Sequence, residues 1–200
     1  MRIELCGGIA SGKSTFASVA QNYLANSIAV YEQISDNCFL TDFYLDPKYY
    51  AFETEIAFLL QHMHQIKVAQ KTSNVLICDY SLEQDYAYGE SNLVGGALNA
   101  FYQTYQEAIN QIHPADLILF FDCPINVLLK RIKTRNRGNE RGIDSEYLSH
   151  TINCLKQRLE SVACPVVVID SEKYDFRNNS VFLNIWSNVM EKSENIFELR

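Results

Sequence analysis

The chain has 200 residues, 48% of them hydrophobic, which is enough for one compact domain with a full core. The formal net charge of −7 argues against a nucleic acid polymer as a partner. No apolar run approaches the roughly 18–20 residues of a membrane span, and the first apolar run begins too early to leave room for a signal peptide. The six cysteines show no C-x-x-C pair or metal-ligand spacing, so we expect a reduced, cytoplasmic protein without a membrane partner.

Short apolar runs alternate with helical patterns along the whole chain. The runs predicted as buried parallel strands are Ile3–Cys6, Ile28–Tyr31, Val75–Cys78, Leu117–Phe121 and Val166–Ile169. Because strand and helix alternate, we expect an α/β fold with one domain over residues 1–200, in which helices flank a five-stranded parallel sheet on both faces. Ligands of such sheets bind at the carboxyl ends of the strands.

Apolar residues three and four positions apart predict the helices. In chain order, their apolar faces consist of Phe52, Ile56, Leu59, Met63 and Ile66, then of Leu148, Ile152, Leu155, Leu159 and Val162 after an N-cap at Asp144, and finally of Phe182, Ile185, Trp186 and Val189.

The most specific motif is the glycine-rich stretch after the first predicted strand. It matches G-x-x-x-x-G-K-S and consists of Gly7, Gly8, Ile9, Ala10, Ser11, Gly12, Lys13, Ser14 and Thr15. Glycines let backbone N–H groups turn inward around phosphate oxygens, while Lys13 would reach the β- and γ-phosphates and Ser14 would bind Mg²⁺. A chance match is disfavoured because a strand precedes the motif and a helical pattern follows it. We therefore expect a P-loop NTPase fold that binds a nucleoside triphosphate.

Acidic residues follow three of the predicted strands. Glu32 follows the second strand, Asp79 the third, with Asp85 six residues further on, and Asp122 the fourth. We expect these carboxylates to converge on the mouth of the phosphate loop, where a carboxylate holds Mg²⁺ or accepts a proton from an attacking hydroxyl. The alternative is that strand-end acids only cap the turns and helices that follow them.

A basic cluster, Lys130–Arg141, stands out in the acidic chain. Arg131 and Arg135 are one helical turn apart, so both could close over a triphosphate and neutralise its charge. Gly138 and Gly142 would give flexibility to a short lid, about residues 131–142, that excludes water. The alternative is a solvated basic helix end, favoured by the helix dipole.

The order and spacing of these motifs resemble the deoxynucleoside kinases, especially the bacterial deoxyadenosine/deoxyguanosine kinase branch, almost from end to end. Besides the phosphate loop, the likeness is carried by residues 36–52, 79–85, 131–140, 142–148, 169–170 and 175–176. The resemblance implies transfer of the ATP γ-phosphate to the 5′-hydroxyl of a deoxynucleoside, with Mg²⁺, in nucleotide salvage. It also implies a homodimer.

The resemblance assigns roles to individual side chains. Glu32 matches the general base, which also lies near the metal, and Asp79 matches an acidic residue beside that metal. For the other ligand contacts, the implied residues are Tyr44 and Glu140 at the sugar 3′-hydroxyl, Arg131, Arg135 and Arg137 in the lid, and Asp175 and Phe176 at the adenine of ATP.

The chain departs from the family at four positions. Gln33 replaces a proline after the base, and Tyr80 replaces an arginine that contacts the reacting centre. Glu55 replaces a glutamine and His62 an arginine in the base-recognition set, whereas the family's aspartate is kept at Asp85. A phenol cannot act as a fixed cation, so either the lid arginines suffice or turnover is slow.

The altered pocket has a chemistry of its own. Glu55 and His62 are two turns apart on one helix face, so they can line one pocket with Tyr80 and Asp85. Asp85 would raise the pKa of Glu55 unless a cation such as His62 intervenes. We hypothesise a preference for bases rich in N–H donors, namely adenine, guanine or cytosine, over thymine. The alternative is that Glu55 faces solvent and His62 simply packs.

Two other functions remain open at this stage. The Tyr80 replacement would suit a degenerate relative that binds nucleotide as a regulatory module, although such a binder needs neither a base nor a lid. The altered pocket would suit a kinase acting on a nucleoside monophosphate or an unusual nucleoside.

Overall fold

The computed structural model describes residues 1–73, 75–140 and 142–197, so Arg141 of the basic cluster lies outside the described residues. Its elements, in order, are β1 (Arg2–Gly7), α1 (Lys13–Tyr23), β2 (Ser27–Val30), η1 (Ile34–Asp36), α2 (Leu40–Leu45), α3 (Pro47–Ala69), β3 (Val75–Cys78), α4 (Leu82–Asn92), α5 (Gly95–Asn110), β4 (Leu117–Asp122), α6 (Ile125–Arg135), η2 (Gly138–Glu140), α7 (Ser145–Leu159), β5 (Val166–Asp170) and α8 (Asn179–Phe197).

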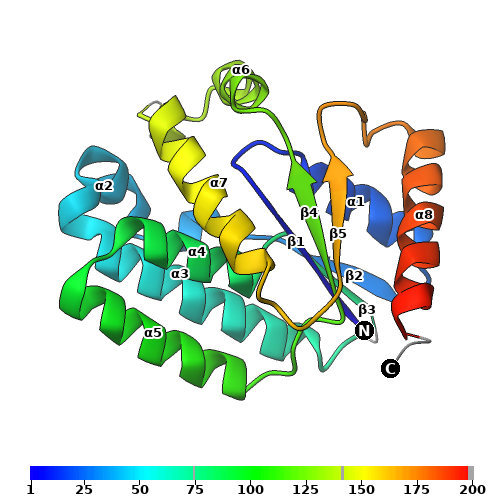
Figure 1. Ribbon diagram of the computed structural model, residues 1–200, viewed down its shortest axis with the longest axis horizontal. Helices are drawn as coiled ribbons and strands as arrows, with labels where there is room; N and C mark the ends of the chain where they lie inside the picture. Colours follow the sequence, from blue (N-terminus) through cyan, green and yellow to red (C-terminus); the bar gives the residue numbers. More distant parts are fainter. Residues whose placement is uncertain (74, 141, 198–200) are drawn as a thin grey trace.

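The strands form one parallel sheet in the order β2-β3-β1-β4-β5. All five predicted strands are therefore confirmed, with β2 ending one residue earlier, at Val30. Since β1 is central, the phosphate loop that follows it emerges at the middle of the carboxyl edge. Figure 1 shows this edge at the top, beneath α6.

Helices cover both faces of the sheet, as predicted (Figure 1). Ile3 and Leu5 of β1 pack with α1 and α8 in one core cluster, while Cys6 packs on the opposite face with residues of α4 and α7. The remaining helices of that second face, α3 and α5, pack on β3. This alternation is what a central strand buried on both faces requires.

Helix α3 is buried on a different face from the predicted one. Leu59 and Ile66 are fully buried as expected, but Phe52 is 40% exposed, and Glu55 and His62 are buried. The helix is apolar on much of its circumference, so periodicity did not show which side meets the core. Its buried side is turned toward the polar residues of the cavity, and an apolar stripe of Tyr49, Phe52, Ile56, Leu60 and Met63 is left at the surface or half-buried.

The two later helices agree with their predictions. Asp144 caps α7 by accepting a hydrogen bond from the backbone N–H of Tyr147 at 2.8 Å, and Val162 packs just beyond the end of the helix. Phe182, Ile185 and Val189 of α8 are buried in the core beside α1. No helix within the described ranges has the length and apolar character needed to cross a membrane.

Candidate active site

A cavity of about 690 Å³ opens at the carboxyl ends of the strands. It brings together residues that are far apart in sequence, including most of the predicted site: Ile9, Ala10, Ser11, Gly12, Lys13, Ser14, Thr15, Glu32, Tyr44, Glu55, Asp79, Asp85, Arg131, Arg135, Arg137 and Glu140. The predicted residues that do not line the cavity are Gly7, Gly8, His62, Tyr80, Asp175 and Phe176.

The phosphate loop has the backbone that its glycines allow. Gly7 and Gly12 have φ values of 141° and 104°, and a Cβ on Gly7 would lie 2.7 Å from the carbonyl oxygen of Phe121. No side chain caps the N-terminus of α1 and no acidic residue lies in its first turn, so the helix end is suited to an anion. The Lys13 ammonium donates to the carbonyls of Gly7 and Gly8 at 2.9 and 3.3 Å, inside the loop.

Two of the strand-end carboxylates face this loop. Burial raises the pKa of Asp79 to about 6 against the opposing effects of the Lys13 charge and a hydrogen bond with Ser14. Its Oδ1 atom is buried without a hydrogen-bond partner among the described residues. A hard oxygen of this kind next to a serine hydroxyl fits Mg²⁺, which takes one or two carboxylates besides substrate phosphates. Glu32, with 28% of its side chain exposed, lines the same cavity.

The third strand-end acid, Asp122, lies elsewhere, and the expected convergence is wrong for this residue. Its carboxylate is 46% exposed and pairs with Lys156 of α7 at 3.0 Å, in a separate depression. The reason is the pleat of β4, which turns the last side chain of the strand away from the phosphate loop.

A buried polar cluster lies next to Glu32. It is formed by His62 and Tyr80, two of the residues at which the chain departs from the family pattern. The His62 ring stacks on Tyr80 with centroids 3.9 Å apart at an interplanar angle of 9°. Its Nδ1 lies 2.9 Å from Oδ2 of Asp85, and its Nε2 lies 3.7 Å from Oε1 of Glu32. Burial lowers the pKa of His62, but the Asp85 carboxylate and its hydrogen bond outweigh burial and raise it overall. The Tyr80 hydroxyl donates to the backbone carbonyl of His62 at 3.4 Å.

Glu55 lies at the base of the cavity and is 5% exposed, so the alternative of a solvent-facing glutamate is wrong. Its Oε1 accepts a hydrogen bond from Nδ2 of Asn92 at 2.7 Å. Burial raises its pKa to about 8 despite that hydrogen bond, and the expected Asp85 charge adds to the rise. The raised pKa favours the protonated carboxyl group, which has an O–H donor and a carbonyl acceptor, the two kinds of group that a glutamine side chain also offers. His62 pairs with Asp85, and its charge lowers the pKa of Glu55 without offsetting the effect of burial.

The lid arginines are held by the protein. Arg131 donates to the backbone carbonyl and hydroxyl of Ser171 at 2.7 and 3.1 Å, and so braces the loop after β5 against the phosphate loop. Arg135 makes a two-point ion pair with Glu140, and Arg137 lies 3.7 Å from the same carboxylate. This carboxylate also raises the pKa of Tyr44, after burial, which links the lid to the residue assigned to the sugar.

The predicted adenine segment differs from expectation in its side chains. Phe176 is 4% exposed and packs edge-on against Phe16 and Phe121 in the core. Asp175 pairs at two points with the exposed Arg177, which lowers its pKa to about 2. Arg177 lines the cavity and was missed, although a basic residue two positions after Asp175 is visible in the sequence.

Other lining residues were also missed. Gln84 accepts a hydrogen bond from the backbone N–H of Gly7 at 2.9 Å and so ties α4 to the start of the phosphate loop. Tyr88 and Tyr147 enclose the side of the cavity beside Glu55. Tyr88 lies three positions after Asp85, on the same side of the helix, and this spacing was the available signal.

Comparison with known proteins decides the family. The family model described as "Deoxynucleoside kinase" matches residues 3–196. The chain belongs to the deoxynucleoside kinase family. It is 31% identical over 192 residues to a deoxyguanosine kinase of Lactobacillus acidophilus, covering 88% of this chain and 83% of that protein. It is 30% identical over 172 residues to a deoxyadenosine kinase of Dictyostelium discoideum, covering 84% and 70%.

The fold of this deoxynucleoside kinase agrees with that of a solved relative. The structure of a deoxyadenosine kinase from M. mycoides, with dCMP and a flexible dCDP bound, superposes with a TM-score of 0.82 at 21% identity, covering 96% of this chain and 100% of that one. The expected P-loop NTPase fold and the expected family are therefore confirmed, and the chain is a kinase of deoxynucleosides.

Proposed function

We propose that the protein transfers the γ-phosphate of ATP to the 5′-hydroxyl of a deoxynucleoside, for nucleotide salvage. The observation that carries the proposal is that Lys13, Glu32 and Asp79, from three segments, line one cavity at the carboxyl edge of the sheet. The loop amides and Lys13 hold the β- and γ-phosphates, Glu32 accepts the proton of the attacking hydroxyl, and the lid arginines neutralise charge on the transferred group. Ser14 and Asp79 would hold Mg²⁺, and the cation would supply charge that shields the phosphates.

The nucleoside occupies the other half of the cavity. Tyr44 and Glu140 contact the sugar, and Glu55 and Asp85 face the base. A neutral Glu55 offers one donor and one acceptor, whereas the Asp85 carboxylate offers acceptors only. Adenine, guanine and cytosine carry an exocyclic amino group that donates a hydrogen bond to Asp85. Thymine has no amino group. We therefore assign the enzyme a preference for purine or cytosine deoxynucleosides.

The test is ATP consumption with Mg²⁺ against a panel of ribo- and deoxynucleosides and their monophosphates. The expected result is turnover of deoxyadenosine, deoxyguanosine or deoxycytidine, and none in Lys13→Ala, which loses the phosphate-binding cation. Thymidine as the best substrate would refute the assignment of the base pocket. ATP binding without turnover of any nucleoside would refute the kinase function itself.

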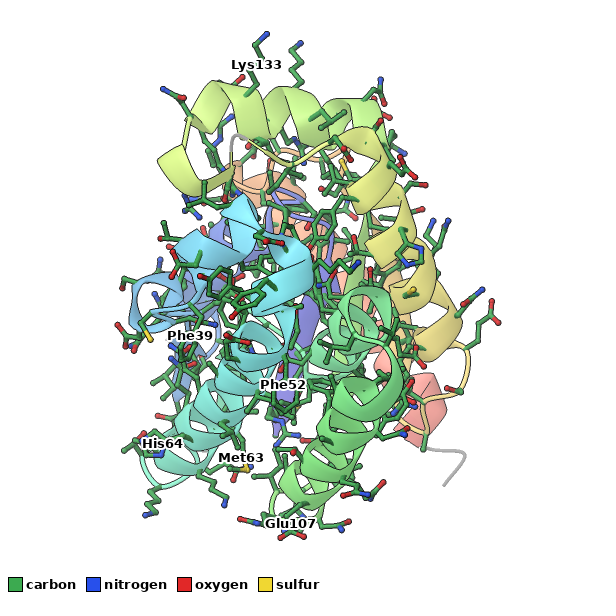
Figure 2. All side chains as sticks on the ribbon, turned by 90° about the vertical axis from the view of Figure 1, so that its left-hand side faces the viewer. Phe39, Phe52, Met63, His64, Glu107 and Lys133 are labelled. Carbon is green, nitrogen blue, oxygen red and sulfur yellow. The ribbon has the colours of Figure 1, made fainter. Side chains whose placement is uncertain are left out.

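Two further properties belong to this proposal. A homodimer is supported by the apolar stripe on α3, whose Tyr49, Phe52 and Leu60 are 73%, 40% and 42% exposed. Figure 2 shows Phe52 and Met63 on the outward side of α3, beside α5. A reducing, cytoplasmic location is supported by Cys6, Cys78 and Cys123, which are buried thiols and form no disulfide.

A further inference from the structure

His62 presents a buried ring nitrogen to Glu32, the candidate general base. The residue is 1% exposed, and its Nε2 atom has no hydrogen-bond partner among the described residues. Oε1 of Glu32 lies 3.7 Å from this nitrogen. A buried nitrogen without a hydrogen-bond partner is unfavourable, so its direction toward a carboxylate calls for a function.

The ring cannot turn away from Glu32. Tyr80 covers one of its faces in a near-parallel stack, and the ring of Phe58 lies 5.7 Å from it, tilted by 29°. Both oxygens of Asp85 lie within 3.0 Å of Nδ1, which fixes the ring about its remaining axis. The imidazole is thus held in place, whereas Glu32 lies in the loop after β2 with 28% of its side chain exposed.

The carboxylates of Asp85 and Glu32 determine which nitrogens of the His62 ring carry a hydrogen. A carboxylate only accepts, so Nδ1 carries a hydrogen toward Asp85 and Nε2 carries a hydrogen toward Glu32. A separation of 3.7 Å is too long for a hydrogen bond, but such contacts in ligand-free active sites shorten when substrates bind. Because the ring is fixed, the movement that closes this gap belongs to the Glu32 side chain.

We propose that His62 is the positioning residue for Glu32. Its Nε2–H donates to one oxygen of the Glu32 carboxylate and so directs the other oxygen at the 5′-hydroxyl, while Nδ1–H keeps Asp85 oriented toward the base. This inference rests on the proposed role of Glu32 as the proton acceptor. His62 itself neither gives up nor receives a proton in the reaction.

Two substitutions of His62 test the roles of its two ring nitrogens separately. His62→Asn keeps a donor near the Nδ1 position, and His62→Gln keeps one near Nε2. We expect His62→Asn to lower kcat about 100-fold with little change in the KM for the nucleoside, because a misplaced reacting group costs that much. We expect His62→Gln to keep most of kcat and to raise KM, because Asp85 loses its partner. His64→Asn and His64→Gln, on the exposed side of the same helix (Figure 2), should behave as wild type.

A purely structural role of His62 would not lower kcat in one variant and raise KM in the other. Equal losses of kcat in both His62 variants, or wild-type kcat in His62→Asn, would overturn the inference. A wild-type enzyme that turns over no nucleoside would instead refute the proposed function, and the contact is then tested without turnover. Proton NMR of the ¹⁵N-labelled protein should show a slowly exchanging Nε2–H of His62 that is lost in Glu32→Ala. Its absence from the wild type, or its survival in Glu32→Ala, would also overturn the inference.

Discussion

Glu32 and Lys13 line the same cavity but serve different parts of the proposed reaction. Replacing Glu32 by glutamine keeps the size of the side chain and removes its ability to accept a proton. We expect Glu32→Gln to lower kcat by about 10²–10⁴-fold, the usual contribution of a general base. Calorimetric ATP binding should stay close to wild type, because the phosphates are held by the loop. Turnover of Glu32→Gln at the wild-type rate would refute the role of Glu32 as base.

Glu55 gives the stability of the protein a pH dependence of known sign. Burial raises its pKa from the ordinary 4.5 to about 8, so the folded protein keeps this proton over a range where the unfolded chain has released it. The contribution of Glu55 to the free energy of unfolding is therefore fully present below pH 4.5 and declines as the pH rises toward 8. Glu55→Gln lacks this decline while keeping an acceptor for Asn92.

Urea denaturation of both proteins across this range measures the effect. We expect the stability difference to move in favour of Glu55→Gln between pH 5 and pH 8, since the wild type alone carries the raised carboxyl pKa of about 8. Asp79 and His62 titrate in both proteins and cancel in the comparison. A difference that is constant with pH would show that Glu55 is ionised in the folded protein.

At the scale of elements, the packing of α4 on α5 depends on Gly89. A Cβ at this position would lie 2.6 Å from Cδ1 of Phe101, whose ring is fully buried and cannot move aside. We expect Gly89→Ala to lower the free energy of unfolding by about 1–3 kcal/mol, because overpacking outweighs the better helix propensity of alanine.

Gly96, at the start of α5, supplies the matched control. Nothing lies within 4 Å of a Cβ built there. Gly96→Ala should therefore leave stability unchanged or raise it by up to about 1 kcal/mol in the same urea experiment. Equal effects of the two substitutions would show that the α4–α5 contact does not depend on the glycine.

At the scale of the whole molecule, the apolar stripe of α3 predicts self-association. We expect the 22.9 kDa chain to sediment with about twice that mass, and Phe52→Glu to sediment as a monomer, because a charge would be buried in the interface. Leu183→Glu, at a site 46% exposed on α8, places the same charge outside the stripe and should leave the dimer intact. A wild-type monomer, or a dimer that survives Phe52→Glu, would exclude this stripe as the interface.

Features set by local chemistry were predictable from the sequence. The strands were visible because each is a short apolar run buried on both faces, and the Asp144 cap because an N-cap is a contact over three residues. The phosphate loop was visible because its glycines meet a backbone requirement that few other residues satisfy. Glu32 and Asp79 were found by a topological rule, since parallel strands end at one edge.

Only the tertiary structure decided which side of an element meets which partner. Periodicity could not choose the buried side of α3, because apolar residues occur around most of the helix, and this choice is what buries Glu55 and His62. The pleat of β4 turns Asp122 away from the cavity, and the ring of Phe176 packs against Phe16 in the core. The contact between His62 and Glu32 joins positions 30 residues apart, and such an encounter depends on how α3 packs against the sheet rather than on any local pattern.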